Sequence, residues 1–205
     1  MVGRPRLHGE DTRQRLVEAA GRLVAEGGPE ALSVRRVSDE VGTTTRALYS
    51  LFGSRVGLVQ AVYAEGFAAF DQRLSAVAVT GDPTADLVAF SLAYRDHALA
   101  DPARYRVMFE RIGGFEPGEA ERAVAQRTLD RLRQLVRRCV RGGVFPGRDV
   151  DAVTLQWWAF GHGLASFELQ GLLGAPADAE RHWRDAMAAA LAGYGSVTTP
   201  RRRRA

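Results

Sequence analysis

The sequence predicts an all-α protein in which an N-terminal three-helix domain with a helix-turn-helix precedes a larger helical domain. Three observations favour this fold class. Apolar residues recur at intervals of three and four, glycine and proline clusters separate the periodic stretches, and no stretch alternates apolar and polar residues as a half-buried strand does. With 205 residues, the chain can bury a core in one large or two small domains.

The chain begins with a basic segment, residues 1–10, in which Arg4 and Arg6 flank Pro5. Two interpretations stay open: an extended arm of this kind can lie in a narrow minor groove of DNA, and the same segment can be a flexible arm without a DNA contact. The first helix is expected over residues 11–26, where Gly27-Gly28-Pro29 ends it. One face of this helix is apolar and is expected to cover the following helices: Leu16, Ala19, Ala20, Leu23 and Val24.

Residues 33–53 predict two short helices joined by a tight turn. The Ser33 hydroxyl can accept from the free N–H groups at the start of the first of these two helices, and Gly42 supplies the left-handed conformation that ends that helix. Thr43 and Thr44 are candidate caps of the second helix, which Gly53 stops. The apolar spacing comes from Val34, Val37 and Val41 in the first helix and from Leu48, Leu51 and Phe52 in the second.

Two short helices in this arrangement form a helix-turn-helix, which places the start of its second helix in the major groove of DNA. Arginine there can pair with both acceptors of guanine, and hydroxyl groups one turn later suit phosphate oxygens. The basic residue at the start of the next helix, near its free N–H groups, suits a phosphate. The predicted DNA-contacting residues are Arg4, Arg6, Ser33, Arg35, Thr43, Thr44, Thr45, Arg46, Tyr49, Ser50 and Arg55.

The alternative for these residues is a surface helix pair with ordinary solvated charges, because a helix-turn-helix pattern alone is a weak signal. No acidic residue lies between Glu40 and Glu65, so acidic neighbours in the sequence do not offset Arg46 and Arg55. This gap in the acidic residues favours DNA as the partner.

The run from Val41 to Val62, VGTTTRALYSLFGSRVGLVQAV, resembles the signature of the tetracycline-repressor (TetR) family of bacterial transcription regulators. The resemblance covers the helix-turn-helix and the helix before it, and it implies a DNA-binding regulator with a ligand-binding and dimerisation domain. The matching positions are Gly42, Leu48, Tyr49, Phe52, Arg55 and Leu58. The sequence departs from the common pattern at Thr43, Arg46 and Leu51, which leaves the preferred bases open, and Arg55 replaces the usual lysine.

Overall charge says little about function here. The net charge of +4 equals the charge of Arg201 to Arg204, so the rest of the chain is close to neutral. The single cysteine, Cys139, excludes an intramolecular disulfide and shares an apolar helical face with leucines, which favours a core position over a redox sensor. No stretch is apolar enough to span a membrane and no signal peptide is evident, so we expect a cytoplasmic protein.

After a long helix that starts near Ser54, about five more helices are expected beyond Gly81-Asp82-Pro83. Glycine and proline place loops at residues 100–102, 113–118, 142–147 and 174–176. The family resemblance implies that this part binds a ligand and forms a dimer.

The segment Gln156 to Glu168, QWWAFGHGLASFE, is similar to a C-terminal domain type of this family that is marked by tryptophan and a His-Gly pair. Gly161 and Gly163 cost about 1 kcal/mol each in mid-helix, so close approach of another helix is expected there. The predicted effector-binding residues are Tyr94, His97, Met108, Phe109, Trp158 and His162. The alternative is that each of these side chains belongs to the core or to a dimer contact.

The last two helices, expected at about residues 150–173 and 177–192, are the candidates for a dimer interface. A two-fold dimer would place its two recognition helices about 34–36 Å apart, one turn of DNA, and would require a palindromic operator. The candidate contacts are Leu155, Leu169, Leu172, Leu173, Met187 and Leu191, for which burial within one subunit is the alternative.

Catalytic motifs are missing from the sequence, which has no HExxH motif, nucleophile elbow, glycine-rich phosphate loop or cysteine pair. His162 and Glu168 are six residues apart and so lean to opposite sides of one helix. We therefore expect no enzymatic activity, no cofactor and no metal.

The sequence thus predicts a homodimeric regulator, most simply a repressor, that binds a palindromic operator in double-stranded DNA and is released by a small-molecule effector. The expected boundaries are residues 1–10 for the arm, 11–55 for the DNA-binding domain, 56–195 for the ligand-binding and dimerisation domain, and 196–205 for a disordered arginine-rich tail. The alternative is a helical protein that binds an apolar ligand without sequence-specific DNA binding. That alternative does not explain the spacing of Thr44, Thr45, Arg46, Tyr49 and Arg55.

Overall fold

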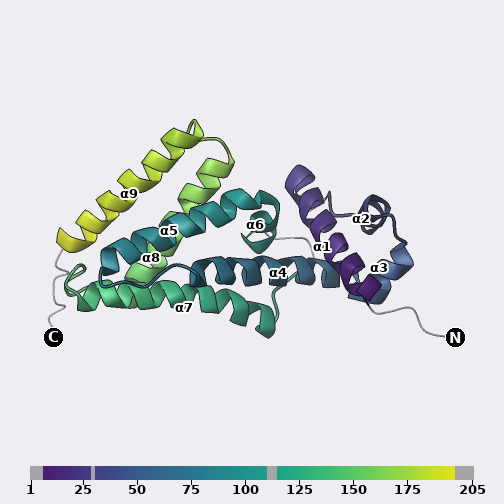
Figure 1. The fold of residues 1–205 in the computed structure, drawn as a ribbon, viewed down its shortest axis with the longest axis horizontal. Coiled ribbons are helices and arrows are strands. Elements are labelled where there is room, and N and C mark those ends of the chain that lie inside the picture. The colour runs from purple at the N-terminus through teal and green to yellow at the C-terminus, as the bar shows by residue number, and fades with distance from the viewer. Residues whose placement is uncertain (1–6, 29–30, 110–114, 197–205) are drawn as a thin grey trace, which may run out of the picture. The chain divides into compact units, whose positions relative to one another are not determined.

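A computed structural model describes residues 7–28, 31–109 and 115–196. All regular elements in these ranges are α-helices, which confirms the predicted fold class. Their bounds are α1 Leu7–Gly27, α2 Val34–Val41, α3 Thr45–Phe52, α4 Arg55–Ser75, α5 Pro83–Ala100, α6 Pro102–Phe109, α7 Glu119–Arg141, α8 Val150–Leu169 and α9 Pro176–Ser196 (Figure 1).

Helix ends differ from the predicted ones by a few residues, because the ends depend on packing that periodicity does not show. The first helix begins at Leu7, and α8 ends at Leu169, four residues before the predicted end. The last helix continues to Ser196. The five helices expected after Gly81-Asp82-Pro83 are α5 to α9.

The chain divides into two compact units. The first unit comprises residues 1–69 and 101–125, and the second comprises residues 70–100 and 126–205. Helix α4 continues from one unit into the other at residues 69 and 70, and α7 does so at residues 125 and 126.

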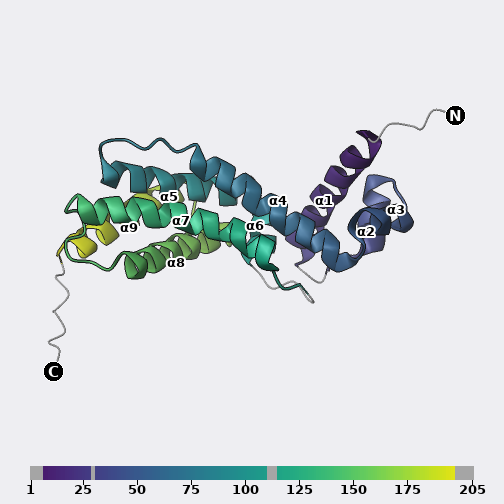
Figure 2. The same ribbon diagram turned by 90° about the horizontal axis from the view of Figure 1, so that it is seen from below.

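In the first unit, α1 packs against α2, α3 and α6 (Figures 1 and 2). Leu16 and Val17 of α1, Val37 of α2 and Leu48 of α3 are fully buried in this core. Gly66 of α4 allows α6 to approach, because a Cβ atom there would lie 2.9 Å from Cγ of Met108. The core thus fixes the two short helices of the predicted DNA-binding motif against α1.

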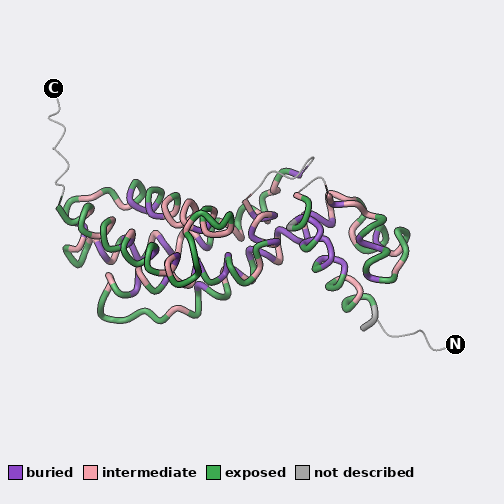
Figure 3. Tube along the Cα trace, turned by 90° about the horizontal axis from the view of Figure 1, so that it is seen from above, coloured by how far each residue is buried: buried purple, intermediate pink, exposed green. Residues whose placement is uncertain are grey.

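In the second unit, α5 packs against α8 and α9, and Figure 1 shows α8 and α9 as a helical hairpin. Trp183 of α9 and Phe145 of the α7–α8 loop are fully buried, and Trp157 of α8 donates its indole N–H to the Ser91 hydroxyl at 2.9 Å. Along the helices, buried and exposed segments alternate as amphipathic helices require (Figure 3).

Three ion pairs fix charged groups in the second unit. Arg95 binds Glu168 in a two-pronged contact with an Nη2–Oε1 distance of 2.6 Å, and both side chains are at most 10% exposed. Asp86, which is also buried, accepts from Arg138 and from the Thr80 hydroxyl.

The third pair joins Arg131 and Asp71, with an Nε–Oδ1 distance of 2.7 Å. The hydrogen bond from Arg131 holds the pKa of Asp71 below its ordinary value. These pairs connect helices that are far apart in the sequence.

Candidate DNA-binding site

Helix α2 has the ends that the sequence predicted. The Ser33 side chain accepts from the N–H of Arg36, and Gly42 adopts a left-handed conformation with φ of 72°. The N–H groups of Gly42 and Thr43 donate to the carbonyls of Asp39 and Ser38, which closes the helix. The turn between α2 and α3 is therefore fixed by backbone hydrogen bonds.

Helix α3 starts at Thr45 after the N-cap Thr44, whose hydroxyl accepts from the N–H of Ala47 at 3.1 Å. Gly53 ends the helix at φ of 71°, and the fully buried Leu48 anchors it to the core. The helix therefore has one face in the core and the opposite face toward solvent.

The solvent-facing side of α3 and its cap carries most of the predicted DNA contacts. Thr43 is half-buried, whereas the following polar side chains are exposed: Thr44, Thr45, Arg46, Tyr49 and Ser50. Tyr49 is 49% exposed although its ring is large and apolar. An exposed tyrosine beside exposed threonine and arginine at the start of a helix suits the sugar-phosphate backbone and the base edges of DNA.

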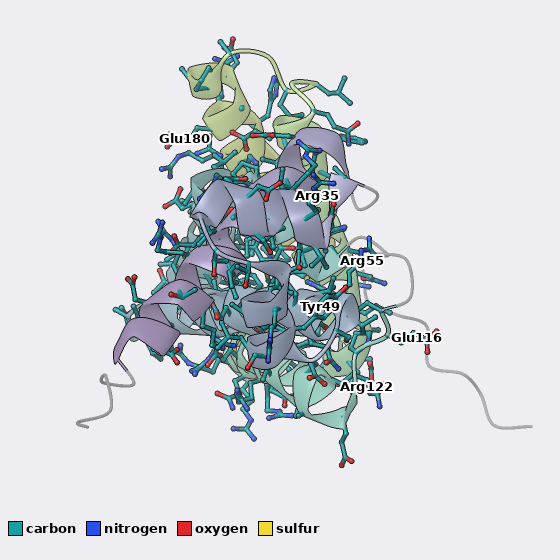
Figure 4. All side chains as sticks on the ribbon, turned by 90° about the vertical axis from the view of Figure 1, so that its right-hand side faces the viewer. Arg35, Tyr49, Arg55, Glu116, Arg122 and Glu180 are labelled. Carbon is teal, nitrogen blue, oxygen red and sulfur yellow. The ribbon has the colours of Figure 1, made fainter. Side chains whose placement is uncertain are left out.

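Helices α2 and α4 supply the remaining predicted contacts. Arg35 is exposed and only 3.9 Å from the Asp39 carboxylate, a weak surface pair, and Ser33 is half-buried. Figure 4 looks onto this end of the first unit and labels Arg35, Tyr49 and Arg55, which come from α2, α3 and α4. Arg4 and Arg6 lie outside the described residues.

Arg55 has a contact that the sequence did not predict. Its side chain is half-buried, and its Nε donates to the backbone carbonyl of Leu32 at 2.9 Å. The predicted phosphate contact of Arg55 stays a prediction, and the structure adds a second role in holding the chain before α2.

Three arginines of α1 also contact the motif and were missed, because their partners lie far along the sequence. Arg15 donates from Nη2 to the carbonyl of Val41 at 3.0 Å, and Arg22 binds Glu40 at 2.8 Å. Arg13 lies 5.6 Å from the centre of the Phe52 ring and binds Glu65 at 2.8 Å.

Comparison with known proteins agrees with this geometry. The family model described as bacterial regulatory proteins, tetR family, matches residues 16–62, and the model described as tetracyclin repressor-like, C-terminal domain, matches residues 87–190. The chain belongs to the TetR family. The resemblance seen in the sequence is thus confirmed, and family membership supports a ligand-responsive transcriptional regulator.

Solved structures share the fold of this TetR-family chain at low sequence identity. A tetR-family regulatory protein from Rhodococcus RHA1 is 17% identical with a TM-score of 0.76, and 91% of this chain and 98% of that chain are covered. The TetR-family regulator PfmR from Thermus thermophilus is 24% identical with a TM-score of 0.72, and the coverage is 87% and 97%.

A third structure, RolR in complex with resorcinol, is 21% identical with a TM-score of 0.58, and the coverage is 96% and 98%. These likenesses show the fold alone. No curated protein matches the sequence. The Trp/His-Gly type of C-terminal domain stays a prediction.

The predicted effector-binding residues of this TetR-family chain divide between the two units. Tyr94, His97, Trp158 and His162 belong to the second unit, whereas Met108 and Phe109 belong to the first. Met108 is buried, and the Phe109 ring contacts Tyr105 at 4.8 Å and Phe67 at 5.7 Å between ring centres. Phe109 therefore packs among aromatic rings of its own unit, and Met108 lies against Gly66 of α4.

In the second unit, Tyr94 and His162 come together from α5 and α8, with 3.4 Å between the tyrosine hydroxyl and Nδ1 of the imidazole. The Phe70 ring packs against both Tyr94 and His97, at 5.0 and 4.7 Å between ring centres. Burial lowers the pKa of His162, because desolvation disfavours the charged imidazolium. Trp158 is half-buried.

Among the described residues, no group of three or more histidine, cysteine, aspartate or glutamate side chains is placed to hold a metal ion. Within the same ranges, no helix is both long enough and apolar enough to cross a membrane. Cys139 is fully buried, and burial raises the pKa of its thiol to about 11. This thiol is in the core, as the sequence predicted.

Proposed function

We propose that this TetR-family regulator is a homodimeric repressor that binds a palindromic operator and releases it when a small-molecule effector binds. The observation that carries the proposal is the exposed polar face at the start of α3, on a helix whose opposite face is anchored by the buried Leu48. A rigid helix with exposed Thr45 and Arg46 at its N-terminus is suited to direct contacts with base edges in the major groove.

The proposed division of labour follows the domain boundaries expected from the sequence. Residues 11–55 bind DNA, with α3 as the recognition helix. Residues 56–195 bind the effector and form the dimer. Helix α4 is continuous from Arg55 to Ser75, so it is the covalent connection through which an effector can alter operator affinity.

The proposed dimer interface is the exposed apolar surface of α8 and of the loop before α9. Leu155, Phe167 and Leu172 are 59%, 52% and 64% exposed, and no charged residue lies between Asp151 and Glu168. Exposed apolar side chains without interspersed charges are typical of a protein interface. Met187, by contrast, is 1% exposed and belongs to the core of its own subunit.

One glycine of α8, Gly163, supports the same interface, because it lies on the side of the helix that carries Leu155 and Phe167, whereas Gly161 faces nearly the opposite side. A Cβ atom at Gly161 or Gly163 would meet no heavy atom within 4 Å among the described residues, so nothing in the subunit itself requires glycine there. Close approach of a partner helix is a reason to keep Gly163, since a glycine costs about 1 kcal/mol in mid-helix. The helices of a second subunit would supply that partner.

Effector binding is proposed for the second unit, around the Tyr94 hydroxyl and the His162 imidazole, the polar groups that meet among aromatic rings there. The effector would bind better to a state with lower operator affinity and so shift the equilibrium toward that state. A compound that occupies this unit and leaves operator affinity unchanged would argue against release by an effector.

Selection of bound fragments from random DNA tests the proposal, with the purified protein at low and at moderate salt. Recovery of one inverted repeat at both salt concentrations is expected. A pool without any motif, whose binding vanishes as salt rises, would leave phosphate attraction alone and contradict an operator-specific regulator.

Two variants, each compared with a control variant, extend this experiment, and the first of them concerns the dimer. Leu155→Asp is expected to convert the dimer to a monomer and to abolish selection of the inverted repeat, whereas Val79→Asp, at an exposed apolar position of the α4–α5 loop, is expected to leave both unchanged. A Leu155→Asp protein that stays dimeric in sedimentation analysis would show that the interface lies elsewhere.

The second variant concerns base recognition. Arg46→Ala is expected to weaken operator binding by about 1–3 kcal/mol and to relax preference at one base pair in each half-site. The control is Arg184→Ala, which removes the same charge from an exposed pair on α9. Equal losses on operator and random DNA would contradict a base contact by Arg46.

A further inference from the structure

We infer that Arg15 and Arg55 are positioning residues that hold the two ends of α2 and thereby set the orientation of the recognition helix. This inference rests on the proposed function, because it concerns how the DNA-binding surface keeps its shape. Neither residue has to touch DNA for this role.

Helix α2 needs such support because it has eight residues. Isolated helices of that length are not stable in water, since the first turn costs more conformational entropy than its few hydrogen bonds return. Its core contacts are few as well: Val37, Ser38 and Val41 are its buried residues. The position of α2 therefore depends on what fixes its two ends.

Each end is fixed by an arginine from another helix. Before the N-cap Ser33, the carbonyl of Leu32 accepts from Nε of Arg55 at 2.9 Å. At the last residue, the carbonyl of Val41 accepts from Nη2 of Arg15 at 3.0 Å. The donors are charged, so these hydrogen bonds are stronger than those between neutral groups.

The Val41 carbonyl has a particular need for such a donor. The last carbonyls of a helix lack partners within the helix. Those of Ser38 and Asp39 are satisfied by the N–H groups of Thr43 and Gly42. Arg15 supplies the corresponding donor to Val41, and it does so immediately before the turn that leads into α3.

The geometry of the turn connects these contacts to DNA recognition. Only Gly42, Thr43 and Thr44 separate α2 from α3, and backbone hydrogen bonds fix the first two of them. A shift of the end of α2 is therefore passed to α3 through a short, rigid connection. Contacts to base edges need precise placement, whereas attraction to phosphates does not.

The experiment compares wild type, Arg15→Ala, Arg15→Lys, Arg55→Ala and the control Arg22→Ala. Arg22 lies on the same helix as Arg15 and binds a side chain of α2, the Glu40 carboxylate, instead of a backbone carbonyl. For each protein, affinity is measured for the selected operator and for random DNA over a range of salt concentrations, together with the base preferences obtained by selection.

Loss of a positioning residue is expected to lower the ratio of operator affinity to random-DNA affinity about tenfold, the size of one charge-assisted hydrogen bond. Base preferences at the positions facing α3 should broaden in Arg15→Ala and Arg55→Ala and be restored in Arg15→Lys, whose ammonium can also donate to a carbonyl. The dependence of random-DNA binding on salt should stay as in wild type in Arg15→Ala, whereas in Arg55→Ala it should weaken by the one phosphate contact predicted for Arg55. Arg22→Ala should retain the wild-type ratio.

Two outcomes would overturn the inference. The first is that the ratio of operator affinity to random-DNA affinity stays unchanged while the salt slope falls by about 0.9 for each phosphate that the variant no longer neutralises. This result would identify Arg15 or Arg55 as a phosphate-binding residue alone. The second is that a variant has lower thermal stability, but the fraction of it that still binds DNA has the wild-type base preferences. This result would identify a merely structural role. If wild type itself selects no operator, the proposed function fails before this inference is reached.

Discussion

The buried ion pair between Arg95 and Glu168 allows a sharp prediction for Glu168→Ala. The carboxylate of Glu168 accepts from Nε and Nη2 of Arg95 at 2.6–3.1 Å and from Nε1 of Trp183 at 2.8 Å. The side chains of Arg95 and Glu168 are 10% and 8% exposed. This one carboxylate therefore connects α5, α8 and α9.

The expected loss of stability follows from what the substitution leaves behind. Without Glu168, the charge of Arg95 stays buried with Glu180 as its remaining carboxylate at 3.9 Å, and the Trp183 indole loses its acceptor. Breaking a buried pair by removing one partner costs about 3–5 kcal/mol. For a chain of this size, that loss lowers the melting temperature by about 6–20 °C.

Urea unfolding and thermal unfolding at one fixed protein concentration measure this loss, because stability of a dimer depends on concentration. The matched control is Arg181→Ala, which breaks the exposed pair with Asp178 on α9 and is expected to cost less than about 1 kcal/mol. The double variant Arg95→Leu with Glu168→Leu should recover most of the loss, since it removes both charges. A loss below about 1 kcal/mol in Glu168→Ala would refute the importance assigned to this pair.

Three further predictions concern buried groups. The Cys139 thiol, whose pKa burial raises to about 11, should not react with maleimide in the folded protein at pH 8 and should react in urea; fast labelling without urea would contradict its core position. Burial lowers the pKa of His162, so the unfolded chain binds a proton there more readily than the folded protein does, and the free energy of unfolding should fall as pH decreases below about 6.5. In unfolding measurements between about pH 5 and 7.5, His162→Gln should reduce this dependence of stability on pH. Ser38→Ala should raise the free energy of unfolding by about 1 kcal/mol, since the buried Ser38 hydroxyl has no hydrogen-bond partner among the described residues; destabilisation on the same scale would reveal a missing partner.

Local signals in the sequence predicted the recognition motif well. Ser33 and Thr44 are N-caps, and Gly42 and Gly53 end their helices with positive φ, as their residue types and spacing indicated. Each of these features depends on neighbours within four residues, so a linear pattern is enough to find it. The order and number of the later helices followed from glycine and proline for the same reason.

Contacts between distant residues could not be predicted in this way. Arg15 and Val41 are 26 residues apart, and Arg95 and Glu168 are 73 apart. Periodicity shows which face of a helix is apolar and does not show which helix meets it. The effector-binding residues stay a prediction, and that prediction groups Met108 and Phe109 with residues of the other compact unit.

The sequence contains no lysine, and all 28 of its Lys-or-Arg positions are arginine. Residue type alone therefore does not distinguish the arginines that could contact DNA from those that make contacts within the protein. The structure separates them by what they contact. Arg15 and Arg55 donate to backbone carbonyls, Arg95 to a buried carboxylate, and Arg35 and Arg46 are exposed on the recognition motif. A guanidinium can serve each of these purposes because its planar set of donors reaches carbonyls, carboxylates, phosphates and guanine alike. The number of arginines therefore says nothing about DNA binding. A candidate DNA contact is identified by an exposed guanidinium on a helix that contacts from other arginines hold in position.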